Sequence, residues 1–274
     1  MSDSDPRLEQ RRIQRHRNHA MRDEDDPVTV EEPMEIRVDG HSVAVVMRTP
    51  GDDLDLTRGF LLTEGIVSDR KDVFEISQCP SQNEGESRGN VVDVLLTKPG
   101  VVDLEQLSRH VFSSSSCGLC GRVTIERVFQ QFSPIDSDLA VTRDLIMGLP
   151  DLLRTAQKTF EQTGGLHASA LFDRKGVLQI LREDVGRHNA LDKVIGAAWE
   201  RDLLPLGQHL LLVSGRISFE LTQKAVCAGI PLIVGISAPS TLAVDCAQEA
   251  NQCLIGFLRE RGMNVYAHSE RVLG

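Results

Sequence analysis

The sequence has few of the features that mark membrane-spanning or secreted proteins. Aromatic residues make up 4% of the chain, with one Trp and one Tyr. No apolar stretch approaches the ~18 residues that a membrane span needs, and no signal peptide opens the chain. Six cysteines in 274 residues are too few for a disulfide scaffold and indicate reduced thiols. We therefore expect a cytoplasmic protein with no membrane association.

The charge balance excludes another class of partner. Asp and Glu number 40 against 30 Lys and Arg, which gives a formal net charge of −10. Because non-specific nucleic-acid binding needs a basic surface, no nucleic-acid partner is expected. Hydrophobic residues make up 41% of the chain, enough for packed cores, and 274 residues correspond to about two domains.

The N-terminal half divides into a tail and a small domain. Residues 1–26 are charge-dense with few apolar positions, which predicts a disordered, solvated tail. Residues 27–140 predict an α+β domain that ends in a Ser- and Gly-rich loop (113–122) and a helix at 125–132. Its other expected elements are a hairpin of 34–38 and 43–47, a helix at 52–64, and strands at 73–76 and 91–96.

The C-terminal half, residues 141–274, alternates helical and strand patterns. This order predicts a three-layer α/β domain whose largely parallel sheet is covered by helices on both faces. The expected elements are helix 145–160, a hairpin of 167–172 and 177–181, helix 188–199, strand 210–213, helix 219–228, strand 232–236, a long helix 241–261 and strand 264–267.

One cysteine pair stands out as a candidate for chemistry. Cys117 and Cys120 form a C-x-x-C motif that follows four serines and is flanked by glycines, so we expect an exposed loop. The start of the following helix and Arg122 would lower a thiol pKa there. Cys227, Cys246 and Cys253 lie beside apolar neighbours, and Cys79 follows an expected strand. All four are expected to be buried, inert thiols.

Spacing alone leaves several roles open for this pair. A structural zinc site is disfavoured because no second C-x-x-C or C-x-x-H pair is present. Thioredoxin-like exchange is possible, although such a motif normally follows a buried strand directly. A relay that carries sulfur as a persulfide and an incidental pair also remain open.

Two polar clusters each lead from the end of an expected strand into the start of a helix. The first contains Arg182, Asp184, Arg187, His188 and Lys193. The second contains Ser214 and Arg216. Ligands in open α/β sheets bind outside the carboxyl ends of strands, where helix N-termini attract anions. The two clusters predict a site for a phosphate-bearing ligand, with Arg259 and Arg261 as further cations.

Several long motifs in this order resemble the FdhD/NarQ family. They are the Cys117–Gly121 loop, Thr163 to Ser169, Arg182 to Lys193, Ser214 to Ser218, and the tail from Val234 to His268. The resemblance runs from about residue 28 to 274. It implies a sulfurtransferase-type carrier needed to activate formate dehydrogenase.

The resemblance also implies residue roles. Cys117 would accept sulfur from a cysteine desulfurase as a persulfide, with Cys120 in a supporting catalytic role. The sulfur would then pass to the molybdenum of bis(molybdopterin guanine dinucleotide), the molybdenum cofactor bound here as substrate, before it enters the apoenzyme. A guanine nucleotide is expected to bind as an analogue. The family's cofactor-binding stretch maps onto Phe257, Leu258, Arg259, Glu260, Arg261 and Gly262.

Family members resemble cytidine deaminases in the C-terminal domain, which implies that fold here. Zinc deamination needs His-x-Glu and Pro-Cys-x-x-Cys at successive helix starts. Here these starts read His188-Asn189-Ala190 and Ser214-Gly215-Arg216, so no zinc is expected. The resemblance further implies a homodimer. Two alternatives remain, a molybdenum-cofactor-binding chaperone that transfers no sulfur and a dithiol oxidoreductase.

Overall fold

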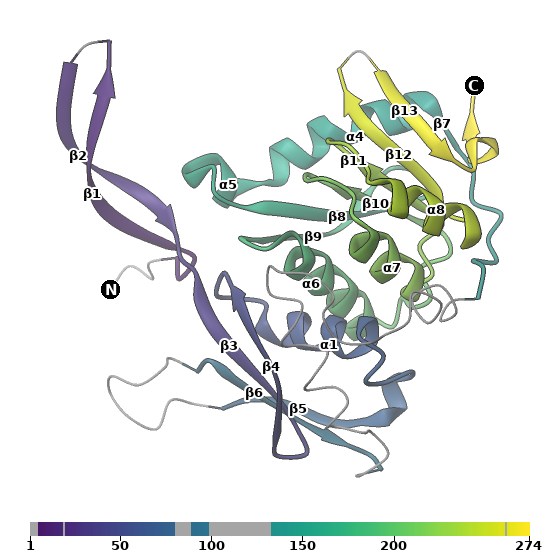
Figure 1. Ribbon diagram of the computed structural model, residues 1–274, viewed down its shortest axis with the longest axis horizontal. Coiled ribbons are helices and arrows are strands. Elements are labelled where there is room, and N and C mark those ends of the chain that lie inside the picture. Colours follow the sequence, from purple (N-terminus) through teal and green to yellow (C-terminus); the bar gives the residue numbers. More distant parts are fainter. Residues whose placement is uncertain (1–4, 19, 80–88, 99–132, 261) are drawn as a thin grey trace.

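The computed structural model describes residues 5–18, 20–79, 89–98, 133–260 and 262–274 (Figure 1). The expected Cys117–Cys120 loop, the helix at 125–132 and Arg261 lie outside these residues. The domain boundaries at 26, 140 and 141 stay predictions. None of the helices in the described ranges is both long and apolar enough to cross a membrane.

The N-terminal part of the chain forms a four-stranded sheet with the strand order β4-β3-β6-β5. Its strands are β3 Glu32–Val38, β4 His41–Arg48, β5 Val73–Cys79 and β6 Val91–Leu96, with a short 3-10 helix η1 at Arg70–Asp72. β3 and β4 form the expected hairpin, which turns at Asp39 and Gly40, both with positive φ. Helix α1, Asp53–Thr63, packs its Leu56, Phe60 and Leu61 onto the inner face of this sheet.

The expected disordered tail is instead a β-hairpin over most of its length. Strands β1 Leu8–Arg17 and β2 Ala20–Thr29 pair antiparallel and project from the body of the molecule (Figure 1). The prediction of disorder rested on the small number of apolar residues in this segment. It failed because the two strands are joined by ion pairs between charged side chains. Arg15 on β1 forms ion pairs with Glu24 and Asp26, which lie farther along β2 than Arg22, the residue opposite Arg15.

The C-terminal part forms a six-stranded sheet with the order β13-β12-β11-β10-β8-β9. Its strands are β8 His167–Asp173, β9 Leu178–Asp184, β10 His209–Val213, β11 Leu232–Gly235, β12 Cys253–Arg259 and β13 Gly262–Ala267. Only the β10–β11 and β11–β12 pairs are parallel in this sheet. The sheet is therefore mixed, not largely parallel as expected, because the β8–β9 and β12–β13 hairpins each add an antiparallel strand. The short strands β7 Val141–Thr142 and β14 Val272–Leu273 pair separately, and η2 spans Ser269–Arg271.

Helices cover both faces of this sheet, as expected. Leu211 and Val213 of β10 pack against α6 Arg187–Glu200, α7 Phe219–Cys227 and α8 Thr241–Glu249. Leu210 and Leu212 point to the other face, against α4 Arg143–Ala156. A break at Gln157 separates α4 from α5 Lys158–Thr163, where one helix was expected. The mixed α/β class is thus present, while the cytidine-deaminase-like arrangement stays a prediction.

The long helix expected at 241–261 is wrong. Helix α8 ends at Glu249, the chain turns through Asn251 at φ 57°, and β12 follows. Five of the seven β12 residues, Cys253 to Gly256 and Leu258, are buried, because this strand is covered by helices on both faces. A strand buried on both sides has a continuous apolar run, which periodicity cannot distinguish from a buried helix.

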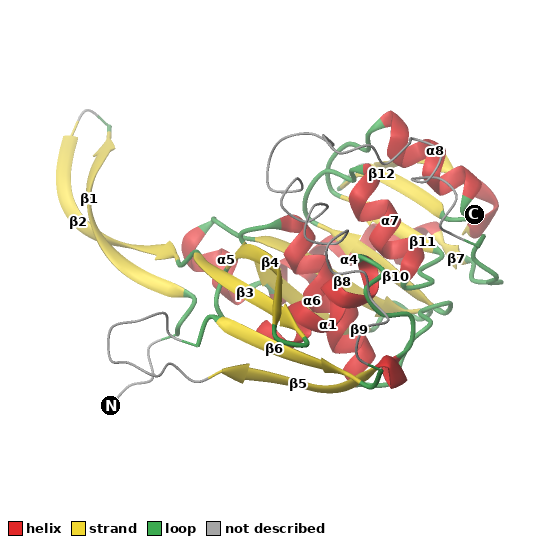
Figure 2. Cartoon of the chain, turned by 60° about the horizontal axis from the view of Figure 1, so that its bottom comes forward, coloured by secondary structure: helices red, strands yellow, loops and turns green. Residues whose placement is uncertain are grey.

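The two sheets are connected through helix packing. Helix α1 of the N-terminal part lies directly against α6 of the C-terminal part (Figures 1 and 2). Trp199, near the end of α6, is buried in the core beneath the four-stranded sheet. The start of α6, which carries Arg187 and His188, is therefore fixed by elements from both halves of the chain.

Candidate functional site

Four strands of the six-stranded sheet end at one edge. β10, β11 and β12 are parallel, and β9 has the same direction because it is antiparallel to β8, which is antiparallel to β10. Neighbouring strands lie about 4.8 Å apart, so the ends of β9 and β12 are about 19 Å apart across this edge. The expected binding stretches therefore lie along one edge, as the strand-end rule predicts.

The side chains of His167, Arg187 and Arg216 lie near the ends of β9 and β10, around the loop that contains Ser214 and Gly215. The Ser214 hydroxyl accepts a hydrogen bond from the Ala168 amide at 2.9 Å, which fixes the end of β10 beside the start of β8. A Cβ at Gly215 would lie 3.3 Å from His167 Nδ1 and 3.8 Å from Arg187 Cδ, so the loop touches both side chains. Arg216 next to it is exposed.

The electrostatics of this group favour an anion. Arg187 Nε is buried and has no hydrogen-bond partner among the described residues. Burial and the positive charge of Arg187, together with His188, lower the pKa of His167. A buried cationic side chain with an unsatisfied donor is the condition that a phosphate would relieve. We refer to His167, Arg187, His188, Ser214 and Arg216 as the anion seat.

His188 makes a second polar contact at the start of α7. Its Nε2 lies 2.7 Å from Glu220 Oε2 and 3.4 Å from Ser218 Oγ. The hydrogen bond from His188 lowers the pKa of Glu220. Both contacts use the same ring nitrogen, whereas a Ser-His-acid relay needs one partner on each nitrogen. This geometry orients His188 and does not activate the serine.

Three of the expected phosphate-binding residues, Arg182, Asp184 and Lys193, are bonded to other parts of the protein. Arg182 donates to Asp55 at 2.7 Å, across the contact between the two halves. Lys193 is 1% exposed and lies 2.8 Å from Asp184, which is itself 0% exposed. These side chains are engaged within the protein, so the structure does not present them to a ligand at the strand ends.

The stretch from Phe257 to Gly262 forms the end of β12 and the turn into β13. A bulge between Gly256 and Arg259 places Phe257 at φ 54°, an unusual conformation for a bulky residue. The Arg259 guanidinium lies over the Phe257 ring, 5.8 Å from its centroid. Leu258 is buried in the core, so its side chain does not reach the edge. Glu260 is exposed in the turn and Gly262 begins β13.

His167 is the seat residue that the sequence analysis did not select. It begins β8, which runs opposite to β9, and it pairs in register with Asp184 at the end of β9. The 167–181 hairpin was expected, and the first residue of such a hairpin lies beside the end of its second strand. Applying that register to His167 would have placed it at the edge.

The four described cysteines are poor nucleophiles, although only Cys246 and Cys253 are buried as expected, whereas Cys79 and Cys227 are partly exposed. Burial raises the pKa of Cys227 and of Cys253 to about 12 and that of Cys246 to about 11. Cys79 donates to Asp93 Oδ2, and this carboxylate raises its pKa. Within the described ranges, no group of three or more His, Cys, Asp or Glu side chains could hold a metal ion.

Comparison with known proteins identifies a consistent set of relatives. The profile of the FdhD/NarQ family matches residues 29–273. The sulfur carrier protein FdhD of Mycobacterium tuberculosis is 50% identical over 254 residues, which cover 89% of this chain and 91% of the relative. The protein of the same name from Streptomyces coelicolor is 48% identical over 269 residues, covering 96% and 95%.

A solved structure from Desulfotalea psychrophila, described as a candidate formate dehydrogenase accessory protein, has the same fold. The TM-score is 0.77, with 98% of this chain and 100% of the other covered. Its sequence identity is 23%, so this likeness concerns the fold alone.

Proposed function

Because the chain belongs to the FdhD/NarQ family, we propose that it is a sulfur carrier that activates a formate dehydrogenase. It accepts sulfur from a cysteine desulfurase as a persulfide on Cys117. It then transfers this sulfur to the molybdenum of the bis(molybdopterin guanine dinucleotide) cofactor, its substrate, before the cofactor enters the apoenzyme. The chain works in the cytoplasm, where thiols stay reduced, and as a homodimer.

One observation carries the sulfur-carrier role. Relatives that are 48–50% identical over 89–96% of this chain are named sulfur carrier proteins. The C-x-x-C pair gives that role a chemical basis, because the other four cysteines have raised pKa values and are held as thiols. Sulfur transfer needs a thiolate, so Cys117 and Cys120 are the candidates that remain.

Loading is an exchange at sulfane sulfur and needs no external oxidant. The Cys117 thiolate attacks the terminal sulfur of the desulfurase persulfide. A sulfur–sulfur bond forms at Cys117, the one on the desulfurase breaks, and the desulfurase cysteine leaves as a thiolate.

Cys120 can serve the release of this sulfur. It either lowers the pKa of Cys117 or attacks its Sγ, which expels hydrosulfide and leaves a Cys117–Cys120 disulfide. That second route requires a thiol reductant to return two electrons before the next cycle.

The anion seat supports the cofactor part of the proposal. The cofactor carries two guanosine diphosphate groups, and the seat offers Arg187 and Arg216 with the helix starts behind them. Arg259 lies at the end of β12, farther along the same edge. An edge about 19 Å long suits an extended polyanion better than a single phosphate.

The sulfur-carrier role is tested by loading the protein with sulfur. Incubation with a cysteine desulfurase and cysteine is expected to add one sulfur atom per chain, measured by intact mass. The Cys117→Ala variant should gain none, whereas the matched Cys246→Ala variant, which changes a buried thiol, should gain as much as wild type. A wild-type protein without the adduct, or a Cys117→Ala protein that keeps it, would contradict the assignment.

A complementation assay separates the carrier from a cofactor chaperone. Cys117→Ala is expected to leave formate dehydrogenase inactive in a strain that lacks this protein. Full dehydrogenase activity with this variant would show that cofactor delivery, without sulfur transfer, is the function.

A further inference from the structure

Asp184 has a complete set of hydrogen bonds although it lies at the end of a strand beside the anion seat. Oδ1 accepts from the Gly186 amide at 2.8 Å and from Asn189 Nδ2 at 3.0 Å. Oδ2 accepts from the Thr49 amide at 3.1 Å and lies 2.8 Å from Lys193 Nζ. The carboxylate is completely buried, so all its interactions are with the protein.

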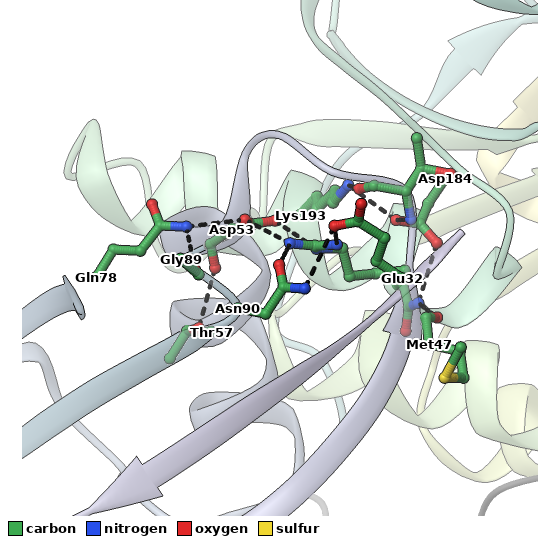
Figure 3. A network of polar contacts seen from close by, with 12 residues as sticks. Glu32, Met47, Asp53, Thr57, Gln78, Gly89, Asn90, Asp184 and Lys193 are labelled. Atoms are coloured by element: carbon green, nitrogen blue, oxygen red, sulfur yellow. Dashed lines mark hydrogen bonds and ion pairs between the residues drawn. The ribbon is translucent and has the colours of Figure 1, made fainter. Parts of the chain in front are cut away.

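The other side of this contact comes from the N-terminal half of the chain. The Met47 carbonyl accepts from Asn189 Nδ2 at 2.7 Å. The Thr49 carbonyl accepts from Lys193 Nζ at 2.8 Å, and its hydroxyl accepts from the Val185 amide at 3.2 Å. The end of β4 is thereby attached to the connection between β9 and α6 (Figure 3).

The end of β4 is itself held rigidly. Arg48 lies between Met47 and Thr49, is 1% exposed, and donates to Asp53 at 3.0 and 3.1 Å and to Asn90 at 2.7 Å. Its guanidinium also contacts Glu32 (Figure 3). The four-stranded sheet and α1 therefore fix the segment that binds Asp184.

This network sets the position of the first turn of α6. The helix begins after Gly186, which provides no side-chain cap, and Arg187 and His188 are its first two residues. Asp184 and Asn189 lie on either side of them and are bound to each other and to β4. A change in the Asp184 contacts would thus move the Arg187 and His188 side chains relative to His167 and Arg216.

We infer that Asp184, with Lys193 and Asn189, is a positioning group that holds Arg187 and His188 in the anion seat by linking the start of α6 to β4. The inference rests on the proposed function only in taking the seat as the place of ligand binding. It gives Asp184 and Lys193 a role through other residues, in place of the direct phosphate contact expected from sequence.

The test compares two buried aspartates that each pair with a lysine. Asp184→Asn removes the charge that binds Lys193 and Thr49. Asp192→Asn is the matched control, because Asp192 lies on α6, is 2% exposed, and is bonded to Lys224 at 2.9 Å and Thr63 at 2.9 Å. Asp192 also joins the two halves of the chain but lies one turn beyond the start of α6. Both variants lose a buried ion pair, and only Asp184 is bonded to Gly186 and Asn189, the residues on either side of Arg187 and His188.

Two measurements are made on the full chain. GDP, as the probe for a guanosine diphosphate group, is titrated by calorimetry. We expect Asp184→Asn to weaken the affinity of the protein for GDP roughly tenfold. This is the lower end of the range that is typical when a group that orients a binding side chain is removed. Ring signals of His167 and His188 in ligand-free protein are followed by NMR and should shift in Asp184→Asn but not in Asp192→Asn.

Asn189→Ala is a milder variant in case Asp184→Asn fails to fold. It removes the contacts to Met47 and Asp184 but keeps the buried charge pair, and it should weaken GDP binding and shift the histidine signals in the same direction. Unchanged histidine signals in the folded variants, or an equal loss of affinity in Asp192→Asn, would overturn the inference. If wild type does not bind GDP, the proposed cofactor role fails, while the histidine signals still decide the positioning role.

Discussion

Gly196 in α6 lies so close to Asp55 in α1 that a Cβ at Gly196 would be 1.8 Å from the Asp55 carbonyl oxygen. The contact is reciprocal, since a Cβ at Gly59 in α1 would lie 1.9 Å from the Asp192 carbonyl oxygen in α6. The two helices therefore meet backbone against backbone. This close approach places α1 and the four-stranded sheet against α6, the helix whose first residues, Arg187 and His188, belong to the anion seat.

Gly196→Ala should destabilise the protein strongly. The added methyl group would overlap main-chain atoms of α1, which cannot move aside as a side chain can. Overpacking of this kind costs about 3 kcal/mol. Urea unfolding monitored by circular dichroism measures the loss as a lower midpoint.

Gly148→Ala is the matched control for this substitution. Gly148 lies in α4, is exposed, and a Cβ there would have nothing within 4 Å. The same change should stabilise the protein by roughly 0.5–1 kcal/mol because alanine is the better helix former. Equal effects of the two substitutions would show that the α1–α6 contact is looser than the structure has it.

Alkylation should separate the cysteines into two classes. Burial raises the pKa of Cys227 and Cys253 to about 12, so at pH 8 about 1 in 10,000 of these groups is a thiolate. The thiolate is the reactive form, and iodoacetamide should therefore modify Cys117 and Cys120 well before the other four. Peptide mass spectrometry of a time course measures this order, and labelling in guanidinium, where all six should react, is the control. Rapid native labelling of Cys227 or Cys253 would contradict the assignment of sulfur loading to Cys117.

Ligand binding at the anion seat should be coupled to protonation of His167. Burial and the Arg187 charge lower its pKa in the free protein. A bound phosphate offsets that charge and raises the pKa of His167, so binding takes up protons and GDP affinity should increase as pH falls from about 8 to 6. Calorimetry in buffers of different ionisation enthalpy measures the uptake. The proposal requires that His167→Gln take up fewer protons than wild type; equal uptake would place the phosphate away from His167.

Local sequence signals located most elements of the fold. Helix 52–64 was expected and is α1 at 53–63, and helix 188–199 is α6 at 187–200, since both have clear apolar positions and termini. The prediction of a helix at 241–261 was wrong beyond Glu249. Because β12 is buried on both faces, its residues do not alternate between apolar and polar. Hairpin β1–β2 was missed because the ion pairs that join its two strands, such as those of Arg15, link residues that are not neighbours in the sequence.

The candidate site was predictable in part for a similar reason. Arg187 and Arg216 follow strands, so the strand-end rule located them from local sequence. Asp184 is bound to Thr49, which lies 135 residues earlier in the chain. No local pattern reveals such a partner, and the strand-end rule therefore assigned Asp184 the same role as its neighbours. Distinguishing a residue that binds a ligand from one that positions it required the tertiary contacts.

Removal of residues 1–26 should leave the rest of the fold intact. Hairpin β1–β2 contributes no residue to the hydrophobic cores of the described part of the chain. It meets the body near its base, where the Thr29 hydroxyl donates to the Thr163 hydroxyl at 3.0 Å, and Thr29 stays in the truncated chain. Its ion pairs are partly exposed, and such pairs contribute about 0–1 kcal/mol each, mainly within the hairpin. The family profile also begins at residue 29, after the deleted segment.

We therefore expect the truncated chain to melt within about 4 °C of wild type by calorimetry, since a change of about 1 kcal/mol shifts the midpoint by roughly 2–4 °C at this size. Sulfur loading of Cys117 should also be retained, because none of the deleted residues that the structure describes belongs to the anion seat or to the α1–α6 crossing. The Arg48→Met variant is the contrasting case, since it breaks a buried pair with Asp53 and should lower stability by about 3–5 kcal/mol. A fall of more than about 10 °C in the truncated chain, well beyond the effect of surface ion pairs, would show that the hairpin is part of the stable fold and not an appendage.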